Sequence, residues 1–334
     1  PSPPSPPCAT VARERERGQL RLQLSQGVNG TTLLAGKLLA HAGFAMLLGA
    51  PAFLALAAIA LLHGTVAPEA LTMLAAYALY LLLWAAGAVL VSGMLPRARD
   101  ALLALVGIWI VTTILLPRLM PDLAMRQLGL PTRIENEAAI HARLNALGDS
   151  HNPDDPYFSR FKQKVLAEYG VERVEDLPVN YGGLVMQEGE RLTSALFDEF
   201  MRADYARQLE QRGIVHGAAL ASPLIALPRL SNALAGADLD NHTRFLFEGE
   251  RYRYRFVQAL NGLHASEVRY EGDRDQRISR AHWADTPRFA YGPAPYLDVA
   301  ARHAWPALLL MSGWLLALLI AARLAAHRLE RTGT

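Results

Sequence analysis

The chain has 334 residues, of which 51% are hydrophobic and 19% are charged, so it is more apolar and less charged than most soluble domains. A formal net charge of +2 and widely dispersed basic residues argue against nucleic acid as a partner. The single cysteine, Cys8, excludes an internal disulfide. Apolar residues crowd into two blocks, 33–119 and 304–326, and leave the middle of the chain polar, which predicts an integral membrane protein.

Four segments are apolar over a length close to the roughly 20 residues that a helix needs to cross the hydrocarbon core of a membrane. They are residues 38–62, 70–94, 101–116 and 304–322. The third is the shortest, and we expect it to end at Pro117 and Arg118, because proline interrupts a helix. The predicted fold is therefore mainly α: a polytopic helical membrane protein with about four transmembrane helices and a helical extracytoplasmic domain.

Lysine and arginine lie before the first span, between the second and third spans, and after the fourth, whereas the loop at 63–69 has neither. Since cytoplasmic flanks carry the excess of positive charge, both termini are predicted to be cytoplasmic. Membrane lipid is one partner that follows from this topology. The predicted regions are a cytoplasmic leader with an amphipathic helix (1–37), three transmembrane helices (38–118), a periplasmic helical domain (119–302), a last transmembrane helix (303–323) and a cytoplasmic tail (324–334).

Apolar residues recur at helical spacing in three segments of the polar region, and each segment stops at a glycine, the usual C-terminal signal. These predicted helices are 134–147, 157–169 and 187–212, and they stop at Gly148, Gly170 and Gly213. Residues 218–235 are apolar but contain two prolines, which favours an interfacial helix or a re-entrant turn. Residues 238–263 predict an amphipathic helix with Asp238 or Asp240 as its N-terminal cap, and residues 272–295 predict a loop.

No motif predicts a catalytic residue, a cofactor site or a metal site. The chain lacks a P-loop for ATP, the H-E-x-x-H zinc signature and the G-x-S-x-G elbow of serine hydrolases. His151, Asp154 and Asp155 lie within five positions and could hold a cation, but the Asn-Pro and Asp-Pro pairs around them favour a turn. Other histidines are scattered without ligand spacing, which favours surface or satisfied core positions. They are His216, His242, His264, His282 and His303.

The most informative element precedes the first span. Residues 11–28 have the pattern of a short charged helix, a glycine at position 18, and an amphipathic turn that leads into the membrane helix. A surface helix of this kind can dock into a groove on a soluble partner. On physical grounds alone, a solvated juxtamembrane linker is an equal alternative.

This element resembles the permease subunits of ABC-2-type exporters, in which a segment similar to R-E-R-E-x-G-T-L-x-x-L-L-S-x-P-V leads into L-x-G-K. The matching strings here are Arg15-Glu16-Arg17-Gly18-Gln19-Leu20, Leu24-Ser25-Gln26-Gly27-Val28 and Leu34-Ala35-Gly36-Lys37. Gln19 stands where threonine is usual, and Gly27 stands where proline is common. Further strings, at 151–157, 181–183, 222–224, 235–238 and 252–254, resemble the subgroup with a large periplasmic insert of unknown function before its last helix.

The resemblance implies a bacterial inner-membrane permease that forms the translocation path of an exporter for an unidentified substrate. It implies two protein partners: a separate ABC ATPase subunit, and a second permease subunit that is identical or different. ATP hydrolysis then lies outside this chain, which is neither an enzyme nor the carrier of a cofactor. The resemblance also implies a truncated N-terminus, because family members have further membrane segments before the charged helix. The ATPase-coupling residues that it implies are Arg13, Glu14, Arg15, Glu16, Arg17 and Gly18.

Two other functions stay open. A membrane-tethered periplasmic binding or sensor module without transport would have no ATPase partner. An enzyme of the membrane surface would need converging polar groups, and only the string from His151 to Asp155 offers any.

Overall fold

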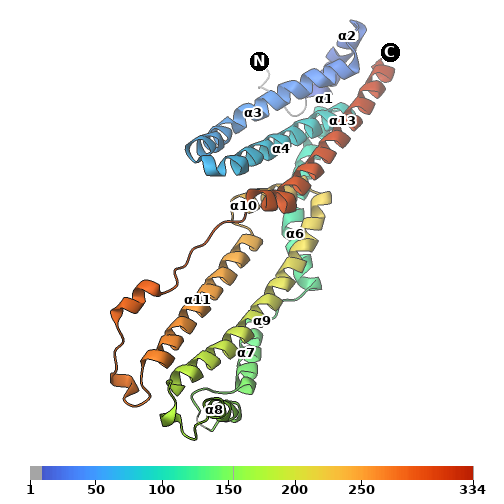
Figure 1. The fold of residues 1–334 in the computed structure, drawn as a ribbon. Helices are drawn as coiled ribbons and strands as arrows, with labels where there is room; N and C mark the ends of the chain where they lie inside the picture. The colour runs from blue at the N-terminus through green and yellow to red at the C-terminus, as the bar shows by residue number, and fades with distance from the viewer. Residues whose placement is uncertain (1–9, 153, 334) are drawn as a thin grey trace. The chain divides into compact units, whose positions relative to one another are not determined.

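The computed structural model describes residues 10–152 and 154–333 (Figure 1). These residues are 83% helical and form no β-strand, which confirms the predicted mainly α fold. The chain forms two compact units. Unit 1 comprises Pro1–Gln127, Gln211–Asn241 and Pro293–Thr334, and unit 2 comprises Leu128–Glu210 and His242–Gly292.

The described part of unit 1 begins with two short helices, α1 (Thr10–Glu16) and α2 (Gln19–Ser25). Gly18 separates them with a φ of 72°, a left-handed backbone conformation that glycine adopts without steric cost. This reversal brings Leu20 of α2 into a buried cluster with Val11 of α1. The predicted order of a charged helix, a glycine and an amphipathic turn is therefore confirmed.

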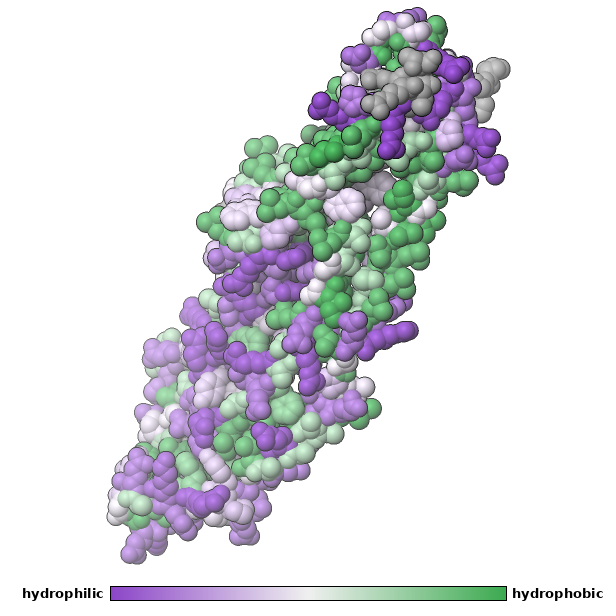
Figure 2. All heavy atoms as spheres, turned by 90° about the vertical axis from the view of Figure 1, so that its right-hand side faces the viewer, coloured by the Kyte–Doolittle hydropathy of each residue, from purple (hydrophilic) through white to green (hydrophobic). Residues whose placement is uncertain are grey.

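In the described part of unit 1, four helices are long and apolar enough to cross a membrane, and each extends beyond the apolar stretch that predicted it. Figure 2 shows hydrophobic residues over these helices, with hydrophilic residues gathered at the end where α1 and α2 lie. The first two, α3 (Gly30–Leu62) and α4 (Ala67–Met94), are joined by the 3₁₀ turn η2 (Gly64–Val66) and lie side by side. The third helix consists of α5 (Ala98–Trp109), the π-helical segment η3 (Ile110–Leu115) and α6 (Leu116–Gln127). The fourth helix consists of α12 (Tyr296–Val299), the π-helical segment η8 (Ala300–Ala304) and α13 (Trp305–Gly333).

The third helix does not end at Pro117 and Arg118, so that prediction is wrong. The π-helical segment lies directly before the proline and widens the helix there. In π geometry the carbonyl of Thr112 would accept a hydrogen bond from the N–H five residues later, at Pro117, which has no N–H. The Oγ of Ser222, a fully buried side chain, donates to this carbonyl at 2.8 Å instead. A hydroxyl from a distant segment thus replaces the missing donor, and the helix continues.

Much of the segment 218–235 is buried within unit 1, although Leu220 is 70% exposed, and its position as an interfacial helix or a re-entrant turn stays a prediction. The segment forms the 3₁₀ turn η5 (Ala218–Leu220) and the helix α10 (Pro223–Leu234). Leu230 of α10 is fully buried, in the same core cluster as Met311 of α13. The apolar side chains of this helix therefore form the core of unit 1 together with α4 and α13.

Unit 2 contains the helices predicted at 134–147 and 157–169, which are confirmed. Its long helix α9 passes through Gly213 to Gly217, so the predicted stop at that glycine is wrong. A glycine inside a helix costs only about 1 kcal/mol, and the packing of Val215 against the core of unit 1 offsets this cost. The elements are α7 (Arg133–Leu147), α8 (Pro156–Tyr169), η4 (Val174–Asp176), most of α9 (Tyr181–Gly217), most of α11 (Leu239–Glu267), η6 (Asp273–Asp275) and η7 (Arg280–Asp285).

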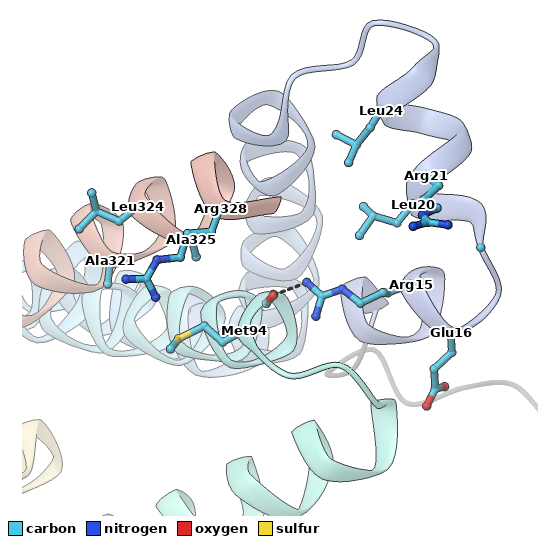
Figure 3. Close-up of a pocket in the computed structure, with 12 residues that line it drawn as sticks. Arg15, Glu16, Leu20, Arg21, Leu24, Met94, Ala321, Leu324, Ala325 and Arg328 are labelled. Atoms are coloured by element: carbon cyan, nitrogen blue, oxygen red, sulfur yellow. Dashed lines mark hydrogen bonds between the residues drawn. The ribbon is translucent and has the colours of Figure 1, made fainter. Parts of the chain in front are cut away.

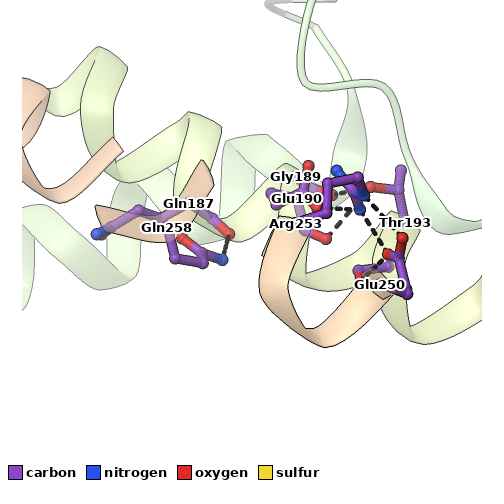
Figure 4. Close-up of polar contacts among 8 residues, drawn as sticks. Gln187, Gly189, Glu190, Thr193, Glu250, Arg253 and Gln258 are labelled. Carbon is purple, nitrogen blue, oxygen red and sulfur yellow. Dashed lines mark hydrogen bonds and ion pairs between the residues drawn. The ribbon is translucent and has the colours of Figure 1, made fainter. Parts of the chain in front are cut away.

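The helices α9 and α11 approach each other within unit 2 at Gly183. A Cβ atom at this position would lie 2.5 Å from the backbone nitrogen of Ala265, so only glycine fits there. Next to this approach, the N–H of Asn180 donates to the carbonyl of Ala265 at 2.8 Å. Farther along, Arg253 of α11 donates to Glu190 of α9 at 2.6 Å (Figure 4). Close backbone packing and an ion pair together hold the two helices.

Candidate functional site

Backbone hydrogen bonds fix α1 to the end of α4. The N–H groups of Val11 and Ala12 both donate to the Oγ of Ser92, each at 3.1 Å. The first N–H groups of any helix lack partners within that helix, so Ser92 satisfies donors that α1 itself cannot. All three residues are buried, so this contact excludes water.

Arg15 of α1 binds the last turn of α4 (Figure 3). Its guanidinium donates to the carbonyl oxygen of Gly93 at 2.8 Å and to that of Leu95 at 3.0 Å. Carbonyl groups at a helix C-terminus lack partners and carry partial negative charge, so a cation is favourable there. Burial lowers the pKa of Arg15, and the two hydrogen bonds compensate for its lost hydration.

The two glutamates of α1 contact two further helices. Glu14 forms an ion pair with Lys37 of α3, and both side chains are largely buried. The Oε1 of Glu16 accepts a hydrogen bond of 3.0 Å from the N–H of Ala98, the first residue of α5. A carboxylate at a helix N-terminus satisfies an unpaired donor and complements the helix dipole. The helix α1 therefore contacts α3, α4 and α5 through charged side chains.

The turn after α1 and the outer side of α2 are exposed. Arg17, Gly18 and Arg21 are solvent-exposed, and the side chain of Leu22 is 60% exposed. The opposite side of α2 carries Leu20, which is buried. The helix α2 is thus amphipathic, with an apolar inner side and an outer side that carries Arg21 next to the exposed Leu22.

A groove of about 830 Å³ separates α2 from the end of α13 (Figure 3). Leucine and alanine side chains form its walls, and Met94 at the end of α4 lies between them. Arginines stand at its rim, so the groove is apolar inside and basic at its opening. The residues that line it are Arg15, Glu16, Gly18, Leu20, Arg21, Leu24, Gly93, Met94, Ala321, Leu324, Ala325 and Arg328.

The six residues with a predicted coupling role divide into two groups. Glu14, Arg15 and Glu16 bind other helices of unit 1, whereas Arg17 and Gly18 are exposed and Arg13 is half-buried. Sequence reasoning treated them as one docking surface, because spacing along the chain does not reveal which charges are already paired. Their coupling role stays a prediction.

The described residues among 151–155 form a turn before α8, as the simpler interpretation predicted; Pro153 lies outside the described residues. Asp155 caps α8, because its Oδ1 accepts hydrogen bonds from the N–H groups of Tyr157 and Phe158 at 2.9 and 3.1 Å. Its Oδ2 accepts from the N–H of Asp149 at 3.0 Å. These hydrogen bonds lower the pKa of Asp155. The bond from the N–H of Asp149 has the largest effect, and those from Phe158 and Tyr157 add to it. Both oxygens of the Asp155 carboxylate therefore accept hydrogen bonds from backbone N–H groups.

A polar cluster around the buried His303, which we call the His303 cluster, joins the start of α11 to η8 within unit 1. The Nε2 of His303 lies 2.9 Å from Oδ2 of Asp240 and 3.6 Å from Oδ2 of Asp238. The Nη1 of Arg212 lies 2.8 Å from the other oxygen of Asp240. His303 and then Arg212 lower the pKa of Asp240 to about 2, so this carboxyl group is ionised at neutral pH.

A cavity of about 440 Å³ adjoins the His303 cluster and is lined partly by His216 and Arg229. Burial, together with the charges of Arg229 and Arg212, lowers the pKa of His216 to about 4, so this histidine is neutral at neutral pH. The sequence offered one signal here, the predicted cap. Asp238 does cap α11, because its Oδ1 accepts a hydrogen bond of 3.2 Å from the N–H of Asn241.

Comparison with known proteins gives two matches. Residues 8–161 match the family model of the ABC-2 family transporter protein, and residues 133–292 match DUF3526, a domain of unknown function. The first match includes α1, α2 and the end of α4, and the second covers much of unit 2. No match was found among curated proteins or among solved structures. The chain thus contains a domain of the ABC-2 family transporter protein, which is consistent with an ABC-2-type permease, and a DUF3526 domain.

Proposed function

We propose that this chain is the membrane-spanning permease subunit of an ABC-type exporter and forms the translocation path with a second permease subunit, identical or different. A separate ABC ATPase subunit supplies ATP hydrolysis. The four apolar helices lie in a bacterial inner membrane, with α1, α2 and the end of α13 in the cytoplasm and the DUF3526 domain in the periplasm. Basic residues near the ends of the spans support this orientation.

The contacts of α1 carry the proposal. A force on α1 reaches α3 through Lys37, α4 through Ser92 and α5 through Ala98. Closure of an ATPase dimer against this end would therefore move three spans together, as a transition between two packed states requires. A solvated linker, the alternative for this segment, would not need such buried contacts.

The exposed side of the corner between α1 and α2 is the docking surface in this proposal. It presents Arg17, Arg21 and Leu22 to a partner, while Glu14, Arg15 and Glu16 transmit the movement. An ATPase that binds here would offer acidic side chains around an apolar pocket.

Co-purification tests the proposal. The full chain carries a C-terminal tag, native membranes are solubilised gently, and mass spectrometry identifies the proteins that co-purify. We expect an ABC ATPase to co-purify with the natural sequence. Its yield should be at least about tenfold lower with the double variant Arg17→Glu, Arg21→Glu, because reversing two charges of the docking surface opposes binding.

The matched control reverses two exposed arginines of α11 in the double variant Arg251→Glu, Arg255→Glu. It makes the same change in net charge and should recover the ATPase in full. If an intact, folded natural chain never brings down an ATPase, a membrane-tethered binding or sensor module is the better assignment.

A further inference from the structure

Three possible metal ligands converge in the His303 cluster from separate places in the chain. Asp238 is the cap of α11, Asp240 lies in its first turn, and His303 lies in the π-helical segment η8 of the last span. One ligand atom from each lies within 4.8 Å of the other two. Unusual π-helical turns often occur at functional sites, and here the turn contains the imidazole.

The separations fit a small divalent ion. Ligand atoms that surround a tetrahedral zinc ion at about 2.05 Å lie about 3.3 Å from one another. The distances from Nε2 of His303 to the two Oδ2 atoms, 2.9 and 3.6 Å, lie on either side of this value. The longer distance exceeds a hydrogen bond, so Oδ2 of Asp238 is not hydrogen-bonded to His303, although Oδ1 caps α11.

Burial sets this cluster apart from ordinary surface carboxylates. His303 is only 5% exposed and its ring faces both carboxylates. Among the described residues, Oδ2 of Asp238 is buried without a hydrogen-bond partner. A buried carboxylate oxygen without a partner is costly, and an ion between it and the imidazole would remove that cost.

The negative charge of the two carboxylates would favour a bound cation. Arg212 pairs with Oδ1 of Asp240 and leaves Oδ2 directed at His303. One neutral imidazole and two carboxylates would offset a charge of +2 on the ion. The adjoining cavity of about 440 Å³ gives space for a water molecule as a fourth ligand and a route of entry.

We propose that Asp238, Asp240 and His303 bind a zinc-type divalent ion, which links the start of α11 to the last span. A nitrogen ligand among the three favours zinc or a similar transition metal over calcium or magnesium, which prefer oxygen ligands only. No activity of the ion is needed for this role, because the bound ion stabilises the contact between the two segments.

Zinc binding to the full chain in detergent tests the proposal. The protein is stripped with EDTA, mixed with Zn²⁺ and passed over a desalting column, and its zinc content is measured by mass spectrometry. We expect one tightly bound zinc per chain, and affinity lowered at least about tenfold in Asp238→Asn and in His303→Gln. The Asp238→Asn variant keeps an acceptor for the cap of α11, so it separates loss of a ligand from loss of the fold.

The matched control is Asp273→Asn, which removes the carboxylate of a His–Asp pair in unit 2, 2.9 Å from His264. This variant should bind zinc as the natural chain does. Replacing zinc with cobalt adds a second readout, because a tetrahedral site with one nitrogen ligand gives strong visible absorption that His303→Gln should change.

Either of two results overturns the proposal: no stoichiometric zinc on the natural chain, or zinc that persists undiminished in both Asp238→Asn and His303→Gln. In that case the cluster is a contact between His303 and the two carboxylates without a metal ion. Recovery of the ATPase is a separate measurement, so this result would leave the proposed function untouched.

Discussion

The guanidinium of Arg15 donates a hydrogen bond of 2.8 Å to the carbonyl oxygen of Gly93, in the last turn of α4. Arg15 of α1 thus supplies a hydrogen-bond donor to a carbonyl group at the end of a span, 78 residues later in the chain. The position of α1 and the integrity of the end of α4 are therefore coupled.

The variant Arg15→Met should show this coupling. It keeps most of the apolar stem but removes hydrogen bonds to two carbonyl groups, and we expect the free energy of unfolding to fall by about 1–2 kcal/mol. Thermal unfolding in detergent measures the change. The control Arg17→Met alters an exposed side chain and should stay within about 0.5 kcal/mol of the natural chain. Equal stability of both variants would contradict the capping role of Arg15.

The variant Ser222→Ala should destabilise the third span at its π-helical segment. It leaves the partly buried carbonyl of Thr112 without the donor that replaces the N–H of Pro117, at a cost of about 1 kcal/mol. Amide hydrogen exchange should therefore quicken between residues 110 and 120. In the double variant Ser222→Ala, Pro117→Ala the restored N–H should recover much of the loss. If the double variant did not recover stability, the claim that Ser222 replaces the N–H missing at Pro117 would be wrong.

Two glycine substitutions should change stability in opposite directions. Gly183→Ala places a methyl group 2.5 Å from the backbone nitrogen of Ala265 and should destabilise unit 2 by at least about 1–3 kcal/mol. Gly249→Ala lies in the interior of α11 with no neighbour within 4 Å, and should stabilise that helix by up to about 1 kcal/mol. Thermal unfolding of both variants checks the signs. A neutral Gly183→Ala would mean that α9 and α11 separate easily.

The cap of α8 should weaken in acid. Because backbone N–H groups lower the pKa of Asp155, its stabilising effect is complete above the unfolded pKa of about 3.9 and is lost as the pH falls through the lower folded value. Asp155→Asn should lack this dependence. Amide exchange in residues 156–169 measures it, with both proteins compared at the same pH so that the intrinsic exchange rates cancel. Parallel behaviour of the two proteins down to pH 2 would contradict the capping role.

Sequence patterns predicted the local features of this chain well. Apolar length located the four spans, and Asp238 was one of two residues predicted to cap the helix that follows it, because it stands directly before a periodic segment. These features depend on neighbours in the chain, which is why one sequence suffices to predict them.

The features that were missed depend on distant partners. The donor that lets the third helix pass Pro117 comes from Ser222, 110 residues from the carbonyl it serves. Likewise, the sequence of α10 does not show that Leu230 packs in one cluster with Met311, because that cluster is built from segments distant in the chain. The His303 cluster was missed for the same reason, because Asp238 and His303 are far apart in the chain and no spacing pattern relates them.

The two π-helical segments lie in the spans that lead into and out of the DUF3526 domain along the chain, whereas α3 and α4 are regular helices in the described structure. A π-turn holds one residue more than an α-turn. Deleting a single residue from Ile110–Leu115 should therefore convert that segment into a regular helix while the side chains on both flanks keep their packing. Such a shortened chain would assemble normally, whereas the same deletion in α4 would rotate half the helix out of its contacts.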